Sequence, residues 1–391
     1  MGVADGTSAW RMAAAGGFSK FNHGGIRMRR MLGWWMTFLL GAAPIAAMAQ
    51  ADAPVPVDGD GDVVDMAPVL VAGVQPGPGL WRVSKDDHVL YILGTQSPLP
   101  RDIDWDAREV REVLDEAGAV LGSPGLSVDA DVGFFRGLTL VPSAMKAMRN
   151  PGGATLAEVL PPELYARWSP LKQQYMGRDR GVEKKRPLIA VYELYKAALD
   201  HSRLRQGGVV GPVLAKELKA RGLESTSTVL KLKIEDPRQA LADFRGEALK
   251  PQDLECFVAT LDVIEQDLPR IAARANAWAV GDVAAMRSMP RNRRQLADCM
   301  DAWVQTEAAR KRGFTDIEAR IRDRWVAAVE KALAAHSVSF ATMSIDTLLY
   351  DREGYLAALS AKGYRIQAPD ELEEADEELP AEDAPDAAAT G

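Results

Sequence analysis

The sequence predicts an α/β (α+β) protein in which strand-helix-strand segments near the two ends of the chain build one sheet. Three observations support this fold class. A strand, strand, helix, strand order occupies residues 79–123, amphipathic helices fill most of residues 130–335, and strand, helix, strand returns over 337–368. Because strands stand at both ends of a helical middle, we expect the two ends to share one sheet. The helices then insert between the two halves as a cap over about 140–335.

The first part of the domain is expected to begin with a hairpin. The runs "LWRVS" and "HVLYILGT" are separated by Lys85-Asp86-Asp87, which is typical of a turn between two strands. Val110, Val113 and Leu114 recur at helical spacing within 106–117, and "AVLGS" (119–123) is a short apolar strand.

Several helices of the insertion carry end signals. Pro161-Pro162 starts one helix, Gly222 ends another, and Pro269 should kink or break the long helical stretch that begins near residue 253. Thr315 and Glu318 have the spacing of a capping box for the last helix. Trp residues at 278, 303 and 325 lie on helical faces and are expected in the core.

The end of the chain predicts a strand over 337–345, a helix over 352–363 and a last strand over 364–368. Beyond it, residues 369–391 contain ten Asp or Glu and no Lys or Arg, which predicts a disordered acidic tail.

The charge of the chain excludes one class of partner. The formal net charge is −8 over 391 residues. Subtracting the ten acidic residues of the tail and the net +4 of residues 1–49 leaves −2 for the body. A nearly neutral body indicates no nucleic-acid-binding surface.

The N-terminus has the features of an export signal. Arg27, Arg29 and Arg30 precede the apolar run of residues 31–48, and Ala47-Met48-Ala49 fits a cleavage site before Gln50. Cleavage of a signal at about 28–49 predicts a periplasmic or secreted protein with no membrane span. The apolar run is close to spanning length, so an uncleaved inner-membrane anchor is the alternative. Residues 1–27 form an N-terminal extension, and the sequence leaves open whether they are translated. The Asp-, Pro- and Gly-rich residues 50–78 are typical of a linker.

Two cysteines, Cys256 and Cys299, remain in the predicted exported part. In an oxidising compartment they form a disulfide candidate, because both lie near ends of predicted helices that can run antiparallel. The alternative is two buried thiols.

The residues after the second strand form a candidate site. Gly94, Thr95, Gln96 and Ser97 end the strand and lead into Pro98, which is how a strand delivers a loop to a binding edge. A Ser97 nucleophile needs a base within hydrogen-bond reach, and "GTQSP" lacks the Gly-x-Ser-x-Gly pattern of a nucleophile elbow.

Several segments in order resemble the TraB/GumN family, which is related to the Tiki-type metalloproteases. They are "LWRVSKDDHVLYILGT", "VREVLDEAGAVL", "RPLIAVYELYKAAL", "ANAWAVGDVAAM" and "GYLAALSAKGYRI". The resemblance covers about 79–367 and implies two α/β halves packed around a cleft. It also implies a divalent metal held by two Gly-x-x-His motifs and a Glu, which would make the protein a metal-dependent peptidase or hydrolase.

This sequence departs from the family pattern at every one of those ligand positions. Ser97 stands for the first His and Ser123 for the Glu, with Gly122 one place away. The second motif falls on Ser344-Ile345-Asp346-Thr347 and keeps neither Gly nor His, so Thr347 replaces the second ligand. The family's Arg-Asn pair becomes Ile321-Arg322 ahead of Trp325.

Those substitutions change the predicted chemistry. Hydroxyls are weak ligands for a d-block metal, and Asp346 supplies only one carboxylate. None of the four histidines (His23, His88, His201, His336) stands at a motif position. We therefore expect a non-catalytic relative without a cofactor, acting as an envelope binding or scaffold protein for a protein, peptide or saccharide. The alternative is a metal-dependent or serine-based hydrolase in the same cleft.

Overall fold

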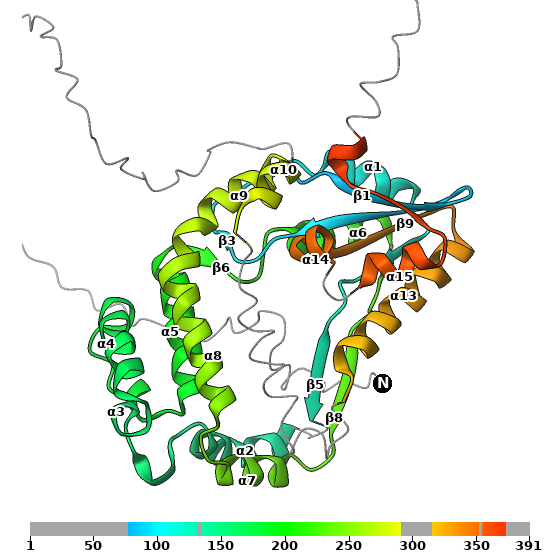
Figure 1. Cartoon of the computed structure of the whole chain (residues 1–391). Helices are drawn as coiled ribbons and strands as arrows, with labels where there is room; N and C mark the ends of the chain where they lie inside the picture. Colours follow the sequence, from blue (N-terminus) through cyan, green and yellow to red (C-terminus); the bar gives the residue numbers. More distant parts are fainter. Residues whose placement is uncertain (1–76, 131–133, 291–314, 352–353, 373–391) are drawn as a thin grey trace, which may run out of the picture. The chain divides into compact units, whose positions relative to one another are not determined.

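The computed structural model of the chain describes four segments of the sequence (Figure 1). The described residues are 77–130, 134–290, 315–351 and 354–372. The predicted signal segment, nearly all of the predicted linker and most of the acidic tail lie outside these residues.

A six-stranded sheet joins the two ends of the described chain, in the order β10-β1-β2-β9-β4-β7. The strands are β1 (Leu80–Lys85), β2 (His88–Thr95), β4 (Ala119–Leu121), β7 (Ser225–Thr226), β9 (Val338–Ser344) and β10 (Arg365–Gln367). The hairpin of β1 and β2 turns through Asp86, which has φ 54°. β10 pairs antiparallel with β1, whereas β2, β9, β4 and β7 run parallel. The α/β fold class and the shared sheet are confirmed.

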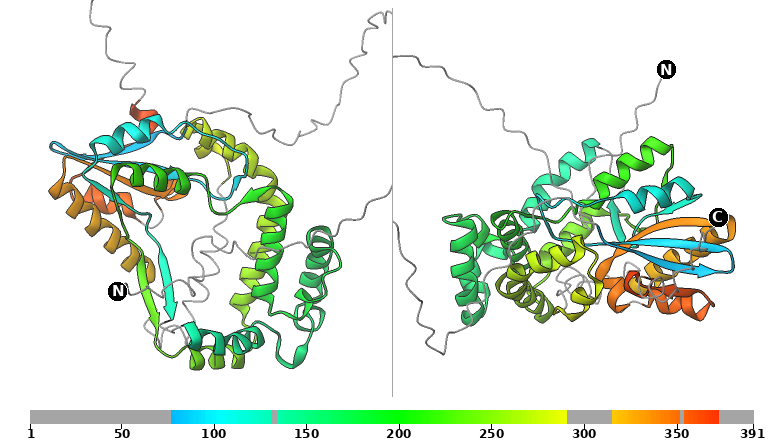
Figure 2. Two further views of the ribbon diagram at one scale, coloured as in Figure 1. Left: turned by 180° about the vertical axis from the view of Figure 1, so that it is seen from behind. Right: turned by 90° about the horizontal axis from the view of Figure 1, so that it is seen from above.

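Helices cover both faces of this sheet (Figure 2). α1 (Arg108–Glu116) and α6 (Val210–Arg221) lie on one face, and α13 (Ile317–Ala335) and α15 (Tyr355–Ala361) lie on the other. Val110 and Leu114, the two buried residues of α1, are two of the three positions that its helical spacing marked as apolar, and the third, Val113, is partly buried. Gly222 ends α6 with φ 67°, the left-handed conformation predicted for it.

The helical insertion has a hydrophobic core of its own, separate from that of the sheet. Trp168 and Phe257 meet at its centre with ring centroids 5.7 Å apart. The elements that contribute are α3 (Leu156–Val159), α4 (Pro162–Met176), η2 (Val182–Lys184), α5 (Pro187–His201), α8 (Pro251–Asp262), η3 (Val263–Asp267) and η4 (Leu268–Arg270). The short η1 (Pro151–Gly153) precedes α3.

A pair of helices, α2 (Phe134–Ala147) and α7 (Pro237–Gly246), packs together beside the insertion. Arg186, the residue before α5, holds this pair in place. Its guanidinium donates to the carbonyls of Ala147, Arg245 and Glu247 and stacks over the Phe244 ring at 4.8 Å. Burial lowers the pKa of Arg186.

The described residues also form two short two-stranded sheets. One pairs β3 (Leu99–Pro100) with β6 (Leu204–Arg205), and the other pairs β5 (Leu126–Ala130) with β8 (Leu230–Ile234).

α9 (Ile271–Ala279) connects the two cores, and α10 (Val283–Ser288) follows it. Ile271 belongs to the core of the insertion, while Ala275 and Trp278 belong to the core of the sheet. The α-helical geometry is interrupted at Pro269, as expected of a kink or break, because α8 continues into a π-helical turn and a 3-10 turn before α9 starts. α9 thus contributes side chains to both cores, and the pairing of β3 with β6 is a second link between them.

Two details of the last helix differ from the sequence-based expectation. α13 lies inside the predicted range of the cap but packs against β2, β9 and α15 of the sheet domain. The predicted capping box at Thr315 is wrong: the N-cap of α13 is Asp316, held at φ 52°, and it makes no side-chain capping bond. The left-handed turn at Asp316 moves the start of the helix one residue past the motif.

Among the described residues, no helix is both long and apolar enough to cross a membrane. The apolar run of residues 31–48, where the signal or anchor is predicted, lies outside them.

Candidate functional site at the carboxyl edge of the sheet

The two loop segments singled out in the sequence lie next to each other. β2 and β9 run parallel in a register that pairs Gly94 with Met343 and Thr95 with Ser344. The hydroxyl of Thr95 donates to the carbonyl of Met343 at 3.1 Å, which ties the two strand ends together. The segments 94–97 and 344–347 therefore leave the same edge of the sheet, as carboxyl ends of parallel strands do.

Gly94 is required by a close approach. A Cβ on Gly94 would lie 2.5 Å from Cδ1 of Ile345, the first residue of α14 (Ile345–Tyr350). The carbonyl of Gly94 accepts a 2.8 Å hydrogen bond from Nε1 of Trp278, a buried residue of α9. Trp278 meets Trp105 edge to face, with ring centroids 6.0 Å apart. The glycine thus lets α14 sit against β2 while the insertion closes the strand end from the other side.

Gln96 and Ser97 have different surroundings. Gln96 is 3% exposed, and its Oε1 has no hydrogen-bond partner among the described residues. Ser97 is exposed, and its hydroxyl donates to the backbone carbonyl of Gln206 at 2.5 Å. The side chain of Gln206 shares a hydrogen bond with Tyr195, and burial raises the pKa of Tyr195 to about 12. A phenol that stays protonated at neutral pH cannot serve as the base for Ser97.

Ser123 meets the neighbouring strand β9 rather than Ser97. Its Oγ lies 2.8 Å from Oγ1 of Thr342, so the two hydroxyls form one hydrogen bond. Thr228, which is 1% exposed, donates to the carbonyls of Gly122 and Ser123 and holds the end of β4. At Ser123, where we expect the family's Glu to fall, the structure has a hydroxyl paired with another hydroxyl.

Asp346 is committed to a buried arginine. Nη2 of Arg274 in α9 donates to Oδ1 of Asp346 at 2.6 Å, and Nη1 donates to the carbonyl of Met286 at 3.2 Å. The side chain of Arg274 is 2% exposed and that of Asp346 is 22% exposed. The carboxylate of Asp346, which the sequence placed near the site, therefore neutralises the buried guanidinium of Arg274. Thr347 follows it in the first turn of α14 and is partly exposed.

The side chains at this edge do not fit a divalent metal. Ser97, Ser123 and Thr347 offer hydroxyls, and the carboxylate of Asp346 is paired with Arg274. Within the described residues, no group of three His, Cys, Asp or Glu side chains is placed to hold a metal ion.

The described histidines lie elsewhere. His88 begins β2 and its Nδ1 is 2.9 Å from the backbone carbonyl of His336, just before β9. Both are at the amino ends of the parallel strands, opposite the candidate site. His201 ends α5, where its ring meets Tyr175 at 5.4 Å. His23 lies outside the described residues.

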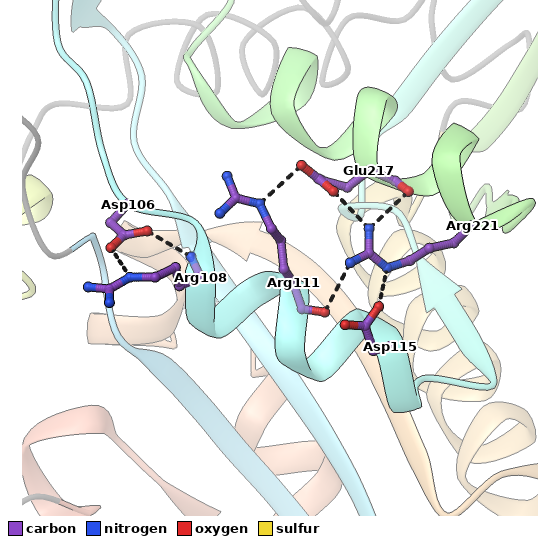
Figure 3. A network of polar contacts seen from close by, with 6 residues as sticks. All are labelled: Asp106, Arg108, Arg111, Asp115, Glu217 and Arg221. Atoms are coloured by element: carbon purple, nitrogen blue, oxygen red, sulfur yellow. Dashed lines mark hydrogen bonds and ion pairs between the residues drawn. The ribbon is translucent and has the colours of Figure 1, made fainter.

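A charged network joins α1 and α6 on the face of the sheet (Figure 3). Glu217 accepts from Arg111 at 3.1 Å and from Arg221 at 2.7 Å, and Arg221 also binds Asp115 at 2.7 Å. Hydrogen bonds from Arg221 and Arg111 lower the pKa of Glu217, and those to Asp115 and Glu217 raise the pKa of Arg221. Asp106 at the start of α1 pairs with Arg108, which lowers the pKa of Asp106.

The cysteine prediction is not tested. Cys256 is 6% exposed and lies in α8, but Cys299 lies outside the described residues. A disulfide between them stays a prediction.

Sequence reasoning missed the two α9 residues that organise the site, Arg274 and Trp278. Trp278 lies in the segment "ANAWAVGDVAAM" (275–286) already quoted for the family resemblance, and Arg274 directly precedes that segment. A lone Arg in an otherwise apolar helix face was the available signal, because an arginine turned into a core needs a partner.

The comparison with protein families identifies the class. The chain belongs to the TraB/PrgY/gumN family, whose model matches residues 79–368. That range covers the sheet and the helical insertion together. Comparisons with curated proteins and with solved structures gave no match.

Proposed function

We propose that this chain is a non-catalytic member of the TraB/PrgY/gumN family. One observation carries the proposal: the carboxylate of Asp346, the only acidic side chain in the two segments that form the site, is bound to the buried Arg274. A carboxylate held by an arginine is a poor metal ligand and a poor base, because either role would leave a buried cation unpaired.

The same edge is suited to holding a polar ligand. The exposed hydroxyl of Ser97 and the partly exposed hydroxyls of Ser123 and Thr347 are neutral hydrogen-bonding groups. Such groups match the amides of a peptide or the hydroxyls of a saccharide. We infer a binding or scaffold role for a peptide, saccharide or protein partner.

The setting proposed for this role is the cell envelope. Its support is the basic, then apolar, then small-residue order of residues 27–49. Mass spectrometry of the protein purified from fractionated cells tests the location. A mature N-terminus at Gln50 in the periplasmic fraction is expected, and an intact N-terminus in the cytosolic fraction would contradict it.

The competing function is hydrolysis, and an assay separates the two. Purified protein is incubated with quenched fluorescent peptides in the presence of zinc, manganese or cobalt, and then with a chelator. We expect the rate to equal that of an Asp346→Asn variant and of a buffer blank. Turnover that is abolished by the chelator, or by Ser97→Ala without a chelator effect, would establish a metal-dependent or a serine-based hydrolase instead.

A further inference from the structure

The helix α2 differs in charge from the rest of the chain. Residues 132–157 contain no Asp or Glu, and they include Arg136, Lys146 and Arg149. The whole chain, in contrast, has a formal net charge of −8. Lys146 and Arg149 are exposed. The segment that contains α2 therefore carries only positive charges, although the acidity of the chain comes mainly from residues 369–391 and residues 235–247 around the neighbouring α7 include four Asp or Glu and two Arg.

The same helix exposes an apolar stripe, formed by Leu138, Val141, Pro142 and Met145. Leu138 is 54% exposed, Val141 40% and Met145 57%. At about 100° per residue, the four side chains fall within roughly 100° of the helix circumference. Three of the six large apolar side chains that are exposed in the described residues thus lie on one face of one helix.

The opposite face of α2 already has its partner. Leu140 and Ala147 are buried there, and α2 packs along α7. Arg186 donates to the carbonyl of Ala147, and Arg238 of α7 donates to the hydroxyl of Thr139 at 3.3 Å. The stripe is thus held outward by a fixed helix pair, and its exposure does not depend on α2 being loose.

We propose that the α2 stripe rests on an anionic lipid surface, with α2 lying in the plane of the membrane. A fixed helix with an outward apolar stripe and adjacent Lys and Arg has the pattern of an in-plane interfacial helix. The cationic side chains complement anionic headgroups, and the stripe enters the boundary with the acyl chains. A second copy of the same helix would instead bring Lys146 and Arg149 toward like charges.

The test uses the full chain with vesicles of phosphatidylglycerol and phosphatidylethanolamine, and with vesicles of phosphatidylcholine alone. Hydrogen exchange of the amides of residues 137–147 is followed, because this readout is specific to α2 even if the N-terminal apolar run also binds lipid. We expect exchange in this helix to slow on the anionic vesicles only, and the effect to weaken with salt.

Variants identify the contributing side chains. Leu138→Glu combined with Met145→Glu should weaken binding to anionic vesicles at least about tenfold in the α2 exchange readout. Val280→Glu, which alters an exposed apolar residue after α9, is the matched control and should leave it unchanged. Circular dichroism of both variants confirms folding.

Two results would overturn the proposal. Unchanged exchange of residues 137–147 on anionic vesicles would exclude a membrane contact of α2. Slowed exchange that needs no vesicles and grows with protein concentration would show that a second copy covers the stripe.

Discussion

Two charged regions of the molecule contrast in how their charges are stabilised. At the carboxyl edge of the sheet, Arg274 is almost fully buried and Asp346 neutralises it. Between α1 and α6, in contrast, the partly buried Glu217 and Arg221 share several bonds with Arg111 and Asp115, whose side chains are 44% and 64% exposed. Removing the partner of a buried cation lowers the stability of the fold strongly, whereas removing one member of a partly exposed network lowers it less. We therefore expect the Arg274–Asp346 pair to contribute more to the free energy of unfolding than the α1–α6 network.

The largest expected effect comes from breaking the buried pair. Asp346→Ala should lower the free energy of unfolding by about 3–5 kcal/mol, because Arg274 is left buried without a counter-charge. Chemical denaturation measures the loss. Arg274→Met combined with Asp346→Leu should lose less than Asp346→Ala alone, since no charge is then left buried. A loss below about 1 kcal/mol in Asp346→Ala would place this pair with surface ion pairs.

A second experiment isolates the bond between insertion and sheet. Trp278→Phe leaves the buried carbonyl of Gly94 without its indole donor. Trp325→Phe is the matched control, because Trp325 is equally buried and its Nε1 has no partner among the described residues. We expect Trp278→Phe to lose about 1–3 kcal/mol more than Trp325→Phe in denaturation. Equal losses would show that the hydrogen bond contributes nothing beyond ring packing.

The third experiment concerns the close approach at Gly94. Gly94→Ala should cost about 1–3 kcal/mol, because the added Cβ meets Ile345 at 2.5 Å. Adding Ile345→Val removes Cδ1 and should restore part of the loss. Gly122→Ala is the control, since its Cβ would meet no atom closer than 3.6 Å. Thermal unfolding of the four proteins would contradict the account if Gly94→Ala and Gly122→Ala behaved alike.

The smallest effect is expected in the α1–α6 network and depends on pH. The pKa of Glu217 is lowered in the folded chain, chiefly by its bond from Arg221. The contribution of Glu217 is therefore present above its unfolded pKa of about 4.3 and is lost as pH falls through the lower folded pKa. Glu217→Gln should show a shallower fall in unfolding free energy below about pH 4.3 than the unmodified chain. Parallel curves would contradict this role.

Sequence patterns predicted the sheet well because its strands are short apolar runs with clear turns. The hairpin at Asp86 and the shared sheet were predicted from such signals, whereas the parallel register of β2 and β9 was not. The burial of Trp278 was also predicted from its helical face.

The partners within the site could not be predicted, because they depend on packing between distant segments. Arg274 and Asp346 are separated by 72 positions and Trp278 and Gly94 by 184. A helical pattern places Arg274 on a helix but does not say that it turns inward. The Thr315 motif failed because the helix starts one residue later, after Asp316 in a left-handed conformation that the spacing of the motif does not reveal.

The most direct test of the proposed non-catalytic site is a metal-binding measurement. Purified full-length protein is dialysed against zinc, manganese or cobalt, and bound metal is measured by elemental analysis beside Asp346→Asn and Ser97→Ala variants. The account predicts that the unmodified chain retains no more metal than either variant. One equivalent of metal per chain, lost in Asp346→Asn or Ser97→Ala, would contradict it.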